Sequence, residues 1–129
     1  MLTELSGPGP EVATATDHTL ETTDGGSFPV RVLSTEHPKS VIVYYHGGGW
    51  VIGDINQFDA LGRQLANRTD SAVVLVGYRK APEHPYPTAV EDSWQALNWV
   101  ADQLDTIAGG PVPILVAGDS AGGNLSAIM

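Results

Sequence analysis

The stretch Ile114-Leu115-Val116-Ala117-Gly118-Asp119-Ser120-Ala121-Gly122, near the end of the chain, decides the fold that the sequence predicts. Its first four residues are apolar and follow a proline, which is typical of a strand buried on both faces. The next five read G-x-S-x-G, and residues 123–129 can continue as a helix. Strand, tight turn and helix in this order predict a nucleophile elbow, in which Gly118 and Gly122 relieve clashes so that Ser120 can present its hydroxyl. An ordinary glycine-rich turn is the alternative interpretation.

A second motif, His46-Gly47-Gly48-Gly49-Trp50, follows the apolar run Val41–Tyr45 directly. A glycine triplet that leaves a buried strand exposes backbone N–H groups, and an acyl-transfer nucleophile needs such donors for the oxyanion of its tetrahedral intermediate. The N–H of Ala121 is a further donor, at the start of the helix after Ser120, where the helix dipole favours negative charge. A phosphate cradle is the rival interpretation, but no G-K-[ST] follows and no G-x-G-x-x-G opens a helix here.

With these two motifs, the chain resembles the hormone-sensitive-lipase-like α/β-hydrolases, bacterial carboxylesterases with HGGGW and GDSAGGN signatures. The segment Tyr78-Arg79-Lys80-Ala81-Pro82-Glu83-His84-Pro85-Tyr86-Pro87 also resembles that family, although an apolar residue is more usual where Lys80 stands. The likeness covers nearly all of residues 41–129.

The resemblance implies a serine esterase that acts on a small-molecule carboxylic ester, with no metal or organic cofactor. Ser120 would attack the acyl carbon, and a downstream Asp/Glu–His pair would supply the base. The backbone N–H groups of Gly48, Gly49 and Ala121 would bind the oxyanion. His46 would support the geometry of its loop rather than act as a base.

The residues after the serine do not complete such a triad. In α/β-hydrolases the chain order is serine, then acid, then histidine. Residues 121–129 contain no Asp, Glu or His, and all 4 histidines precede Ser120. Without a base the hydroxyl is a poor nucleophile, so we expect this chain alone to be inactive. We expect it to be the first part of a longer enzyme, truncated after the elbow; a natural remnant is the alternative.

Two further functions stay open. A non-catalytic small-molecule binder could use the same fold, as do the plant hormone receptors related to these esterases. An amidase or peptidase would share all the residues seen here and differ only in contacts to the leaving group. The residue at the triad-histidine position would separate the binder from the enzymes.

Composition excludes several classes of protein. The chain has 129 residues, with 6 Lys and Arg against 15 Asp and Glu, so its formal charge is −9. Such an acidic surface repels phosphate backbones, which argues against a nucleic-acid partner. There is no cysteine for a disulfide or a thiolate. The N-terminus lacks the features of a signal peptide and no apolar run is long enough to span a membrane, so the expected location is cytoplasmic. The oligomeric state stays open.

Apolar strands that alternate with helices predict an α/β fold with a mostly parallel, doubly wound sheet. Strands are expected at residues 41–45, 72–76 and 114–117, with both glycine motifs at carboxyl ends, where such sheets bind ligands. Residues 16–22 and 28–32 flank the turn signal Asp24-Gly25-Gly26 and predict an N-terminal antiparallel hairpin, whose Pro29 indicates an edge strand or a first position. Residues 1–15 are expected to be a loose arm, and residues 16–129 the N-terminal part of an α/β-hydrolase domain.

Two helices are expected between the strands. Phe58, Leu61 and Leu65 recur at helical spacing over residues 57–68. Thr88 and Glu91 form a capping-box signature at the start of the second helix, which Gly109 and the residues after it end. The apolar face of that helix is expected to hold Val90, Trp94, Leu97, Ala101 and Leu104. Of its two tryptophans, only Trp94 is clearly expected in the core.

The remaining polar residues are predicted to have structural or surface roles. Asp54 and Arg79 are expected to brace loops through hydrogen bonds, and Asp119 to be structural because the turn points its side chain away from Ser120. His18, His37 and His84 are expected at the surface. His46, His84 and Asp54 have no recognisable ligand spacing, so no metal site is predicted.

Overall fold

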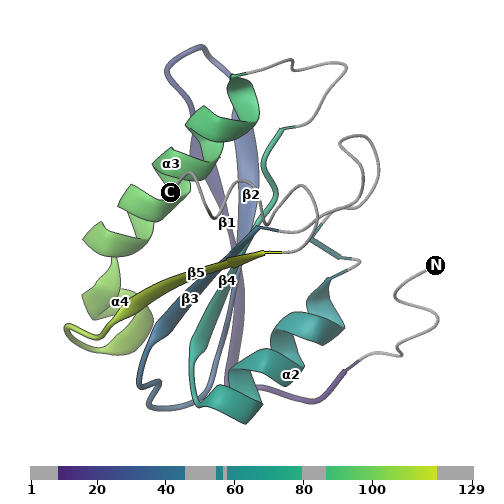
Figure 1. Cartoon of the computed structure of the whole chain (residues 1–129), viewed down its shortest axis with the longest axis vertical. Helices are drawn as coiled ribbons and strands as arrows, with labels where there is room; N and C mark the ends of the chain where they lie inside the picture. Colours follow the sequence, from purple (N-terminus) through teal and green to yellow (C-terminus); the bar gives the residue numbers. More distant parts are fainter. Residues whose placement is uncertain (1–8, 46–54, 57, 80–86, 119–129) are drawn as a thin grey trace.

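The computed structural model describes residues 9–45, 55–56, 58–79 and 87–118, which form a five-stranded mixed sheet with helices on both faces (Figure 1). The strands are β1 (Thr14–Glu21), β2 (Ser27–Ser34), β3 (Val41–Tyr45), β4 (Ala72–Val76) and β5 (Ile114–Gly118). The helices are α2 (Asp59–Thr69), α3 (Thr88–Asp102) and α4 (Leu104–Ala108). Helices α3 and α4 pack on one face of the sheet and α2 on the other, which separates two hydrophobic cores.

The strands lie in the order β1-β2-β4-β3-β5. β2 is antiparallel to both β1 and β4, while β3 is parallel to both β4 and β5. The expected α/β fold, with a parallel part and an N-terminal antiparallel hairpin, is therefore confirmed. Because β3 lies between β4 and β5, its carboxyl end has a parallel neighbour on either side.

β3 and β4 are buried along their whole length. Successive side chains point to opposite faces, so Val43 and Tyr45 enter the core under α3, and Tyr44 enters the core under α2. Both faces are covered by helices, which is why these strands are continuous apolar runs rather than alternating ones. The bounds predicted for both strands are confirmed.

The hairpin places Pro29 in an interior strand, so the expectation of an edge strand or a first position is wrong. β2 lies between β1 and β4, but its pairing with β4 begins only at Val30, opposite Val76. The carbonyl of Pro29 accepts a 2.8 Å hydrogen bond from the N–H of Gly77. In an antiparallel pair, the N–H and C=O of one residue face the same neighbour, so the N–H that proline lacks would face Gly77, just beyond β4. The proline therefore leaves out only the second bond of the Pro29–Gly77 pair, beyond the end of the β2–β4 ladder at Val30, and the paired residues Val30–Ser34 are unaffected.

Helix α2 confirms the helix expected over residues 57–68, but not the position of Leu61. That side chain is 44% exposed. The small residues Gly62 and Ala66 face the sheet instead. A Cβ on Gly62 would lie 2.8 Å from Cδ1 of Leu33, so the absent side chain lets the helix approach the strands closely.

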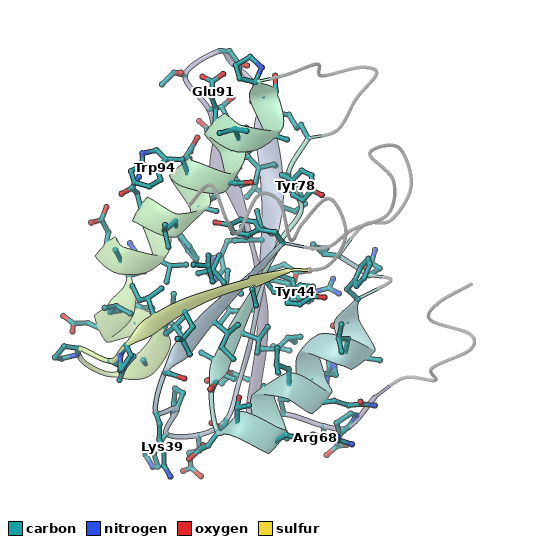
Figure 2. All side chains as sticks on the ribbon, in the orientation of Figure 1. Lys39, Tyr44, Arg68, Tyr78, Glu91 and Trp94 are labelled. Atoms are coloured by element: carbon teal, nitrogen blue, oxygen red, sulfur yellow. The ribbon has the colours of Figure 1, made fainter. Side chains whose placement is uncertain are left out.

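Helix α3 differs from its prediction in three ways. The helix starts at Thr88 without a side-chain cap, because Pro87 is at the N-cap position. It ends at Asp102, and the short α4 follows before Gly109, whose φ of 77° ends that helix in the left-handed region. Trp94 is 53% exposed and lies on the outer side of α3 (Figure 2), whereas Trp99 packs against the core. The expectations of a Thr88 cap and of a buried Trp94 are therefore wrong.

The described residues before β1 run along α2. The side chain of Asn67 donates a 2.9 Å hydrogen bond to the carbonyl of Glu11, and a Cβ on Gly9 would lie 2.7 Å from Cα of Ala60. β1 itself begins at Thr14. The division of the chain into an arm and a hydrolase domain at residue 15 stays a prediction.

Candidate active site

The three parallel strands end at the same level of the sheet. Tyr45, the last residue of β3, is in register with Val76 at the end of β4 and with Gly118 at the end of β5. Neighbouring strands lie about 4.8 Å apart, so the chain leaves this edge at three adjacent points. Ligands of open α/β sheets bind at this carboxyl edge.

Two of these exits lead directly into the glycine motifs. His46 follows Tyr45, and Asp119 follows Gly118. The two motifs therefore begin at the ends of neighbouring strands.

Of the residues that the sequence assigns to the site, the structure describes Gly118. It is the half-buried last residue of β5, one residue beyond the strand that the sequence predicted. The others lie outside the described residues, so their roles stay predictions: His46, Gly48, Gly49, Ser120, Ala121 and Gly122. The same is true of Asp54, His84 and Asp119.

Tyr45 connects the end of β3 to α3. Its side chain is fully buried, and its hydroxyl donates a 2.8 Å hydrogen bond to the backbone carbonyl of Ser93. Burial raises the pKa of Tyr45 well above its usual value of 10.0. The hydroxyl therefore keeps its proton, and remains a donor, over the whole neutral pH range.

The residue before Ser93 in α3, Asp92, holds the chain that leaves β4. Its carboxylate is 1% exposed and accepts three hydrogen bonds from Arg79, from the backbone N–H (2.9 Å), Nε (3.0 Å) and Nη2 (2.9 Å). This fork-to-carboxylate geometry is the strong form of an ion pair. The hydrogen bond to Asp92 is the main reason why the pKa of Arg79 is raised. The prediction that Arg79 braces a loop is confirmed.

Arg79 also reaches the hairpin turn. Its Nη1 lies 3.2 Å from each carboxylate oxygen of Asp24, which also accepts hydrogen bonds from the Thr22 hydroxyl and the Gly26 N–H. The Thr22 hydroxyl, then the Gly26 N–H and then Arg79 lower the pKa of Asp24 to about 2. One guanidinium thus joins the β1–β2 turn, the end of β4 and α3.

Sequence patterns did not directly indicate the partners of Arg79 and Tyr45. Asp92 and Ser93 are buried polar residues, whereas helical periodicity places apolar residues on the buried face. One signal was present: α3 contains no Lys or Arg. A buried carboxylate on this helix must therefore find its cation elsewhere, and Arg79 is the first described cation before it in the chain.

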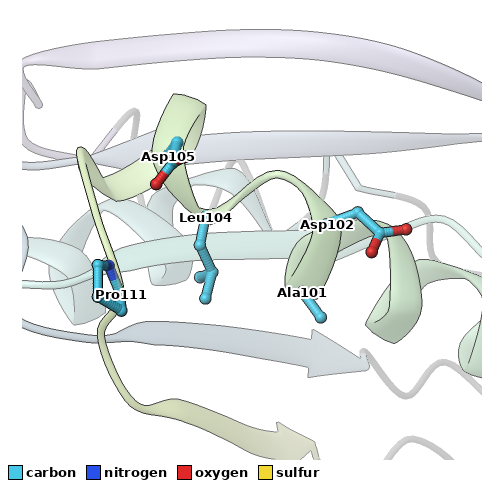
Figure 3. Close-up of a pocket in the computed structure, with 5 residues that line it drawn as sticks. All are labelled: Ala101, Asp102, Leu104, Asp105 and Pro111. Carbon is cyan, nitrogen blue, oxygen red and sulfur yellow. The ribbon is translucent and has the colours of Figure 1, made fainter.

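The described part of the chain contains two hollows. One of about 210 Å³ is lined by Ala101, Asp102, Leu104, Asp105 and Pro111, near the amino end of β5 and away from the carboxyl ends of the strands (Figure 3). Another of about 150 Å³ lies beside Arg79, and its lining includes Asp24 and Asp92, which already accept the hydrogen bonds of Arg79.

The described histidines lie at the surface. His18 is exposed, with its ring centroid 5.1 Å from that of Trp99, and His37 is exposed as well, so both predictions are confirmed. Within residues 9–45, 55–56, 58–79 and 87–118, no group of three or more His, Cys, Asp or Glu side chains has the arrangement of a metal site. None of the helices that the structure describes is long and apolar enough to cross a membrane.

Comparison with known proteins gives relatives that include bacterial carboxylesterases. Carboxylesterase NlhH of Mycobacterium tuberculosis is 53% identical over 89 residues, which are 69% of this chain and 28% of that protein. Carboxylic ester hydrolase LipN of the same species is 40% identical over 129 residues, 99% of this chain and 31% of that protein. Among solved structures, the carboxylesterase EstE1 from a metagenomic library superimposes with a TM-score of 0.88 at 44% identity, covering 98% of this chain and 43% of that one.

The chain therefore spans less than a third of the length of these two curated relatives. A family described as the alpha/beta hydrolase fold matches residues 42–129, from the second residue of β3 through both glycine motifs. The matched residues include the parallel strands β3, β4 and β5, whose ends meet at one edge of the sheet. On this match, and on its likeness to bacterial carboxylesterases, the chain belongs to the α/β-hydrolase family.

Proposed function

We propose that this chain carries the nucleophile and the oxyanion-binding residues of a serine hydrolase that cleaves carboxylic esters. The observation that carries the proposal is the register of β3 with β5, in which Tyr45 pairs with Gly118. The two motifs that the reaction needs thereby start next to each other: Tyr45 directly precedes the first motif, and Gly118 is the first residue of the second. The names of the relatives, carboxylesterase and carboxylic ester hydrolase, support the substrate class.

The reach of the chain is compatible with this chemistry. A residue extends the chain by at most about 3.6 Å, so Ser120 lies within about 7 Å of Gly118, and Gly48 within about 11 Å of Tyr45. The two starting points are themselves about 4.8 Å apart. The oxyanion requires donors within about 3 Å, and short segments from neighbouring strands can meet this requirement.

The reaction proceeds by acyl transfer. The Ser120 oxygen forms a bond to the acyl carbon, while a base takes its proton and the carbonyl oxygen becomes an oxyanion. The N–H groups of Gly48, Gly49 and Ala121 bind that oxyanion. Collapse of the intermediate expels the alcohol, and water then releases the acid from the acyl-enzyme. The general base is a histidine that this family orders after the serine, beyond residues 121–129.

Ser120→Ala tests the nucleophile in the complete product of the encoding gene. The wild type should hydrolyse a short-chain p-nitrophenyl ester and react with a fluorophosphonate probe at Ser120. The variant should lose both the turnover and the label, because no other group can form the acyl-enzyme. Labelling that persists in Ser120→Ala would place the nucleophile elsewhere, and a wild type that binds the ester without turnover would favour the non-catalytic binder.

Gly48→Val and Gly49→Val test the oxyanion donors in the same assay. Losing one donor typically lowers kcat about a hundred- to a thousandfold, which corresponds to about 2.7–4 kcal/mol. KM should change little, because the lost interaction belongs to the transition state. A change in KM alone would contradict the assignment of these glycines.

A further inference from the structure

Two adjacent residues of α3 hold the ends of two parallel strands. The Ser93 carbonyl accepts the hydroxyl of Tyr45 at the end of β3, and the Asp92 carboxylate accepts Arg79, just after the end of β4. Tyr45 and Val76 are register partners, and Arg79 follows Val76 by three residues, so one attachment is made at the carboxyl end of β3 and the other just beyond the carboxyl end of β4. One turn of α3 is thereby bonded to two neighbouring exits of the carboxyl edge.

The attachment of Tyr45 is buried and specific. Tyr45 and Ser93 are both fully buried, and the residues that the hydrogen bond joins are 48 positions apart in the sequence. The hydroxyl of Ser93 donates to the Ala89 carbonyl at 2.7 Å, within its own helix. The Ser93 carbonyl, in contrast, accepts the Tyr45 hydroxyl from outside the helix. The position of α3 therefore restrains the position of the last residue of β3.

The position of α3 is in turn fixed by Arg79. This side chain bonds Asp92 and Asp24, so it ties α3 to both β4 and the hairpin turn. Gly77, two residues earlier, is bonded to Pro29 of β2 at 2.8 Å, and Tyr78 between them is 1% exposed. The chain that leaves β4 is therefore held at every step, and α3 is held by it.

We propose that Tyr45 is a positioning residue for ester hydrolysis: through the Ser93 carbonyl it fixes the point from which the His46-Gly47-Gly48-Gly49 segment starts. The inference rests on the proposed function, because it gives Tyr45 a role only if those glycines bind the oxyanion. Tyr45 touches neither substrate nor reacting atoms; it acts through the backbone that follows it. Oxyanion donors must be held in place before the reaction, and a displacement of about 1 Å can cost about a hundredfold in rate.

A role in core packing alone predicts a different result. Tyr45→Phe keeps the buried ring and removes only the hydroxyl, so a packing role predicts a small loss of stability and unchanged kinetics. The positioning role predicts a selective loss in the transition state. We expect kcat for a p-nitrophenyl ester to fall roughly tenfold, within the range that a displacement of up to about 1 Å allows, with KM nearly unchanged.

A trifluoromethyl ketone gives a second readout, because serine hydrolases bind it as a tetrahedral adduct with an oxyanion. Its affinity should fall in Tyr45→Phe by the same factor as kcat/KM, as for any analogue of the transition state. Val43→Ala is the matched control: Val43 is fully buried, on the same strand and in the same core, and bonds to nothing in α3 through its side chain. It should lower Tm at least as much as Tyr45→Phe and leave kcat and inhibitor affinity unchanged.

The outcomes separate this inference from the proposed function. A Tyr45→Phe enzyme with unchanged kcat, or with losses no more selective than those of Val43→Ala, overturns the positioning role while Ser120→Ala still abolishes turnover. A wild type without ester hydrolysis overturns the proposed function and the positioning role with it. Arg79→Lys adds an independent arm: it keeps the charge but loses the planar fork, so it should also lower kcat and inhibitor affinity without raising KM. A rise in KM alone would count against the inference.

Discussion

Breaking the Arg79–Asp92 pair from one side should destabilise the protein strongly. Arg79→Met removes two side-chain donors from a carboxylate that is 1% exposed and leaves only the backbone N–H of residue 79. An uncompensated buried charge typically costs about 3–5 kcal/mol, a large part of the roughly 5–15 kcal/mol by which domains are stable. Asp92→Leu should cost a similar amount, because it leaves a largely buried guanidinium with only Asp24 as its partner.

The double variant Arg79→Met/Asp92→Leu should be less destabilised than either single variant. Two apolar side chains replace two charges, and the main remaining cost is the N–H of residue 79, about 1–3 kcal/mol for an unsatisfied buried donor. Urea unfolding of the four proteins, wild type, both single variants and the double variant, measures the coupling as a double-mutant cycle. We expect a coupling of at least about 2 kcal/mol. Free energies that add to within about 0.5 kcal/mol would show that the two groups do not depend on each other.

Two further predictions concern acid pH and the edge of the sheet. Because the folded pKa of Asp24, about 2, is below its usual 3.8, its contribution to stability is complete above pH 3.8 and is lost as the pH falls towards 2. Asp24→Asn should flatten that acid decline in a urea-unfolding series, and an unchanged pH profile would contradict the prediction. On β5, Leu115 is 52% and Val116 37% exposed, on opposite faces of a strand that pairs only with β3 among the described strands, so the 129-residue chain should self-associate by size-exclusion chromatography. Leu115→Lys should reduce the association, and a monomeric wild-type chain would refute it.

The strands were predictable because their signal is local. β3 and β4 are apolar at every position and are covered on both faces, so the sequence shows their bounds directly. The register of β3 with β5 was not predicted, because the pairing of two segments far apart in the sequence leaves no local signal in either strand. Likewise Pro29 indicated an edge strand, because the sequence does not show that β2 extends beyond the end of β4.

The helix faces were less predictable, because small and polar residues can face a sheet. In α2, Gly62 and Ala66 let the helix approach, so Leu61 turns outward. In α3, the buried positions include Asp92 and Ser93, and Trp94 is displaced to the solvent side. The reason is non-local, because the residues that bond Asp92 and Ser93 belong to other parts of the chain. Arg79, just after β4, bonds Asp92, and Tyr45, the last residue of β3, bonds Ser93.

The polar groups that the core buries differ between the two edges of the sheet. At the amino edge, Ser34 and Ser71 are neutral hydroxyls, bonded to the carbonyl of Thr35 and the hydroxyl of Ser40, both at 2.8 Å. At the carboxyl edge Ser93 is also a buried neutral hydroxyl, but its neighbour Asp92 is charged, and burying a charge costs far more than burying a hydroxyl. A buried ion pair of this kind is weak evidence for stability, since apolar residues of similar size often do as well.

What the pair provides at the carboxyl edge is a single arrangement. Three nitrogens of Arg79, the backbone N, Nε and Nη2, donate to Asp92, which restrains the placement of α3 against β4, and that placement sets where the Ser93 carbonyl meets Tyr45. We therefore infer that the Arg79–Asp92 ion pair, although costly to bury, serves to position α3 at the edge of the sheet where both glycine motifs begin. The double variant distinguishes a role in stability from a role in positioning. If Arg79→Met/Asp92→Leu restores stability but kcat stays low, the ion pair is needed to position α3. If it restores both, packing alone is enough to hold Tyr45 in place.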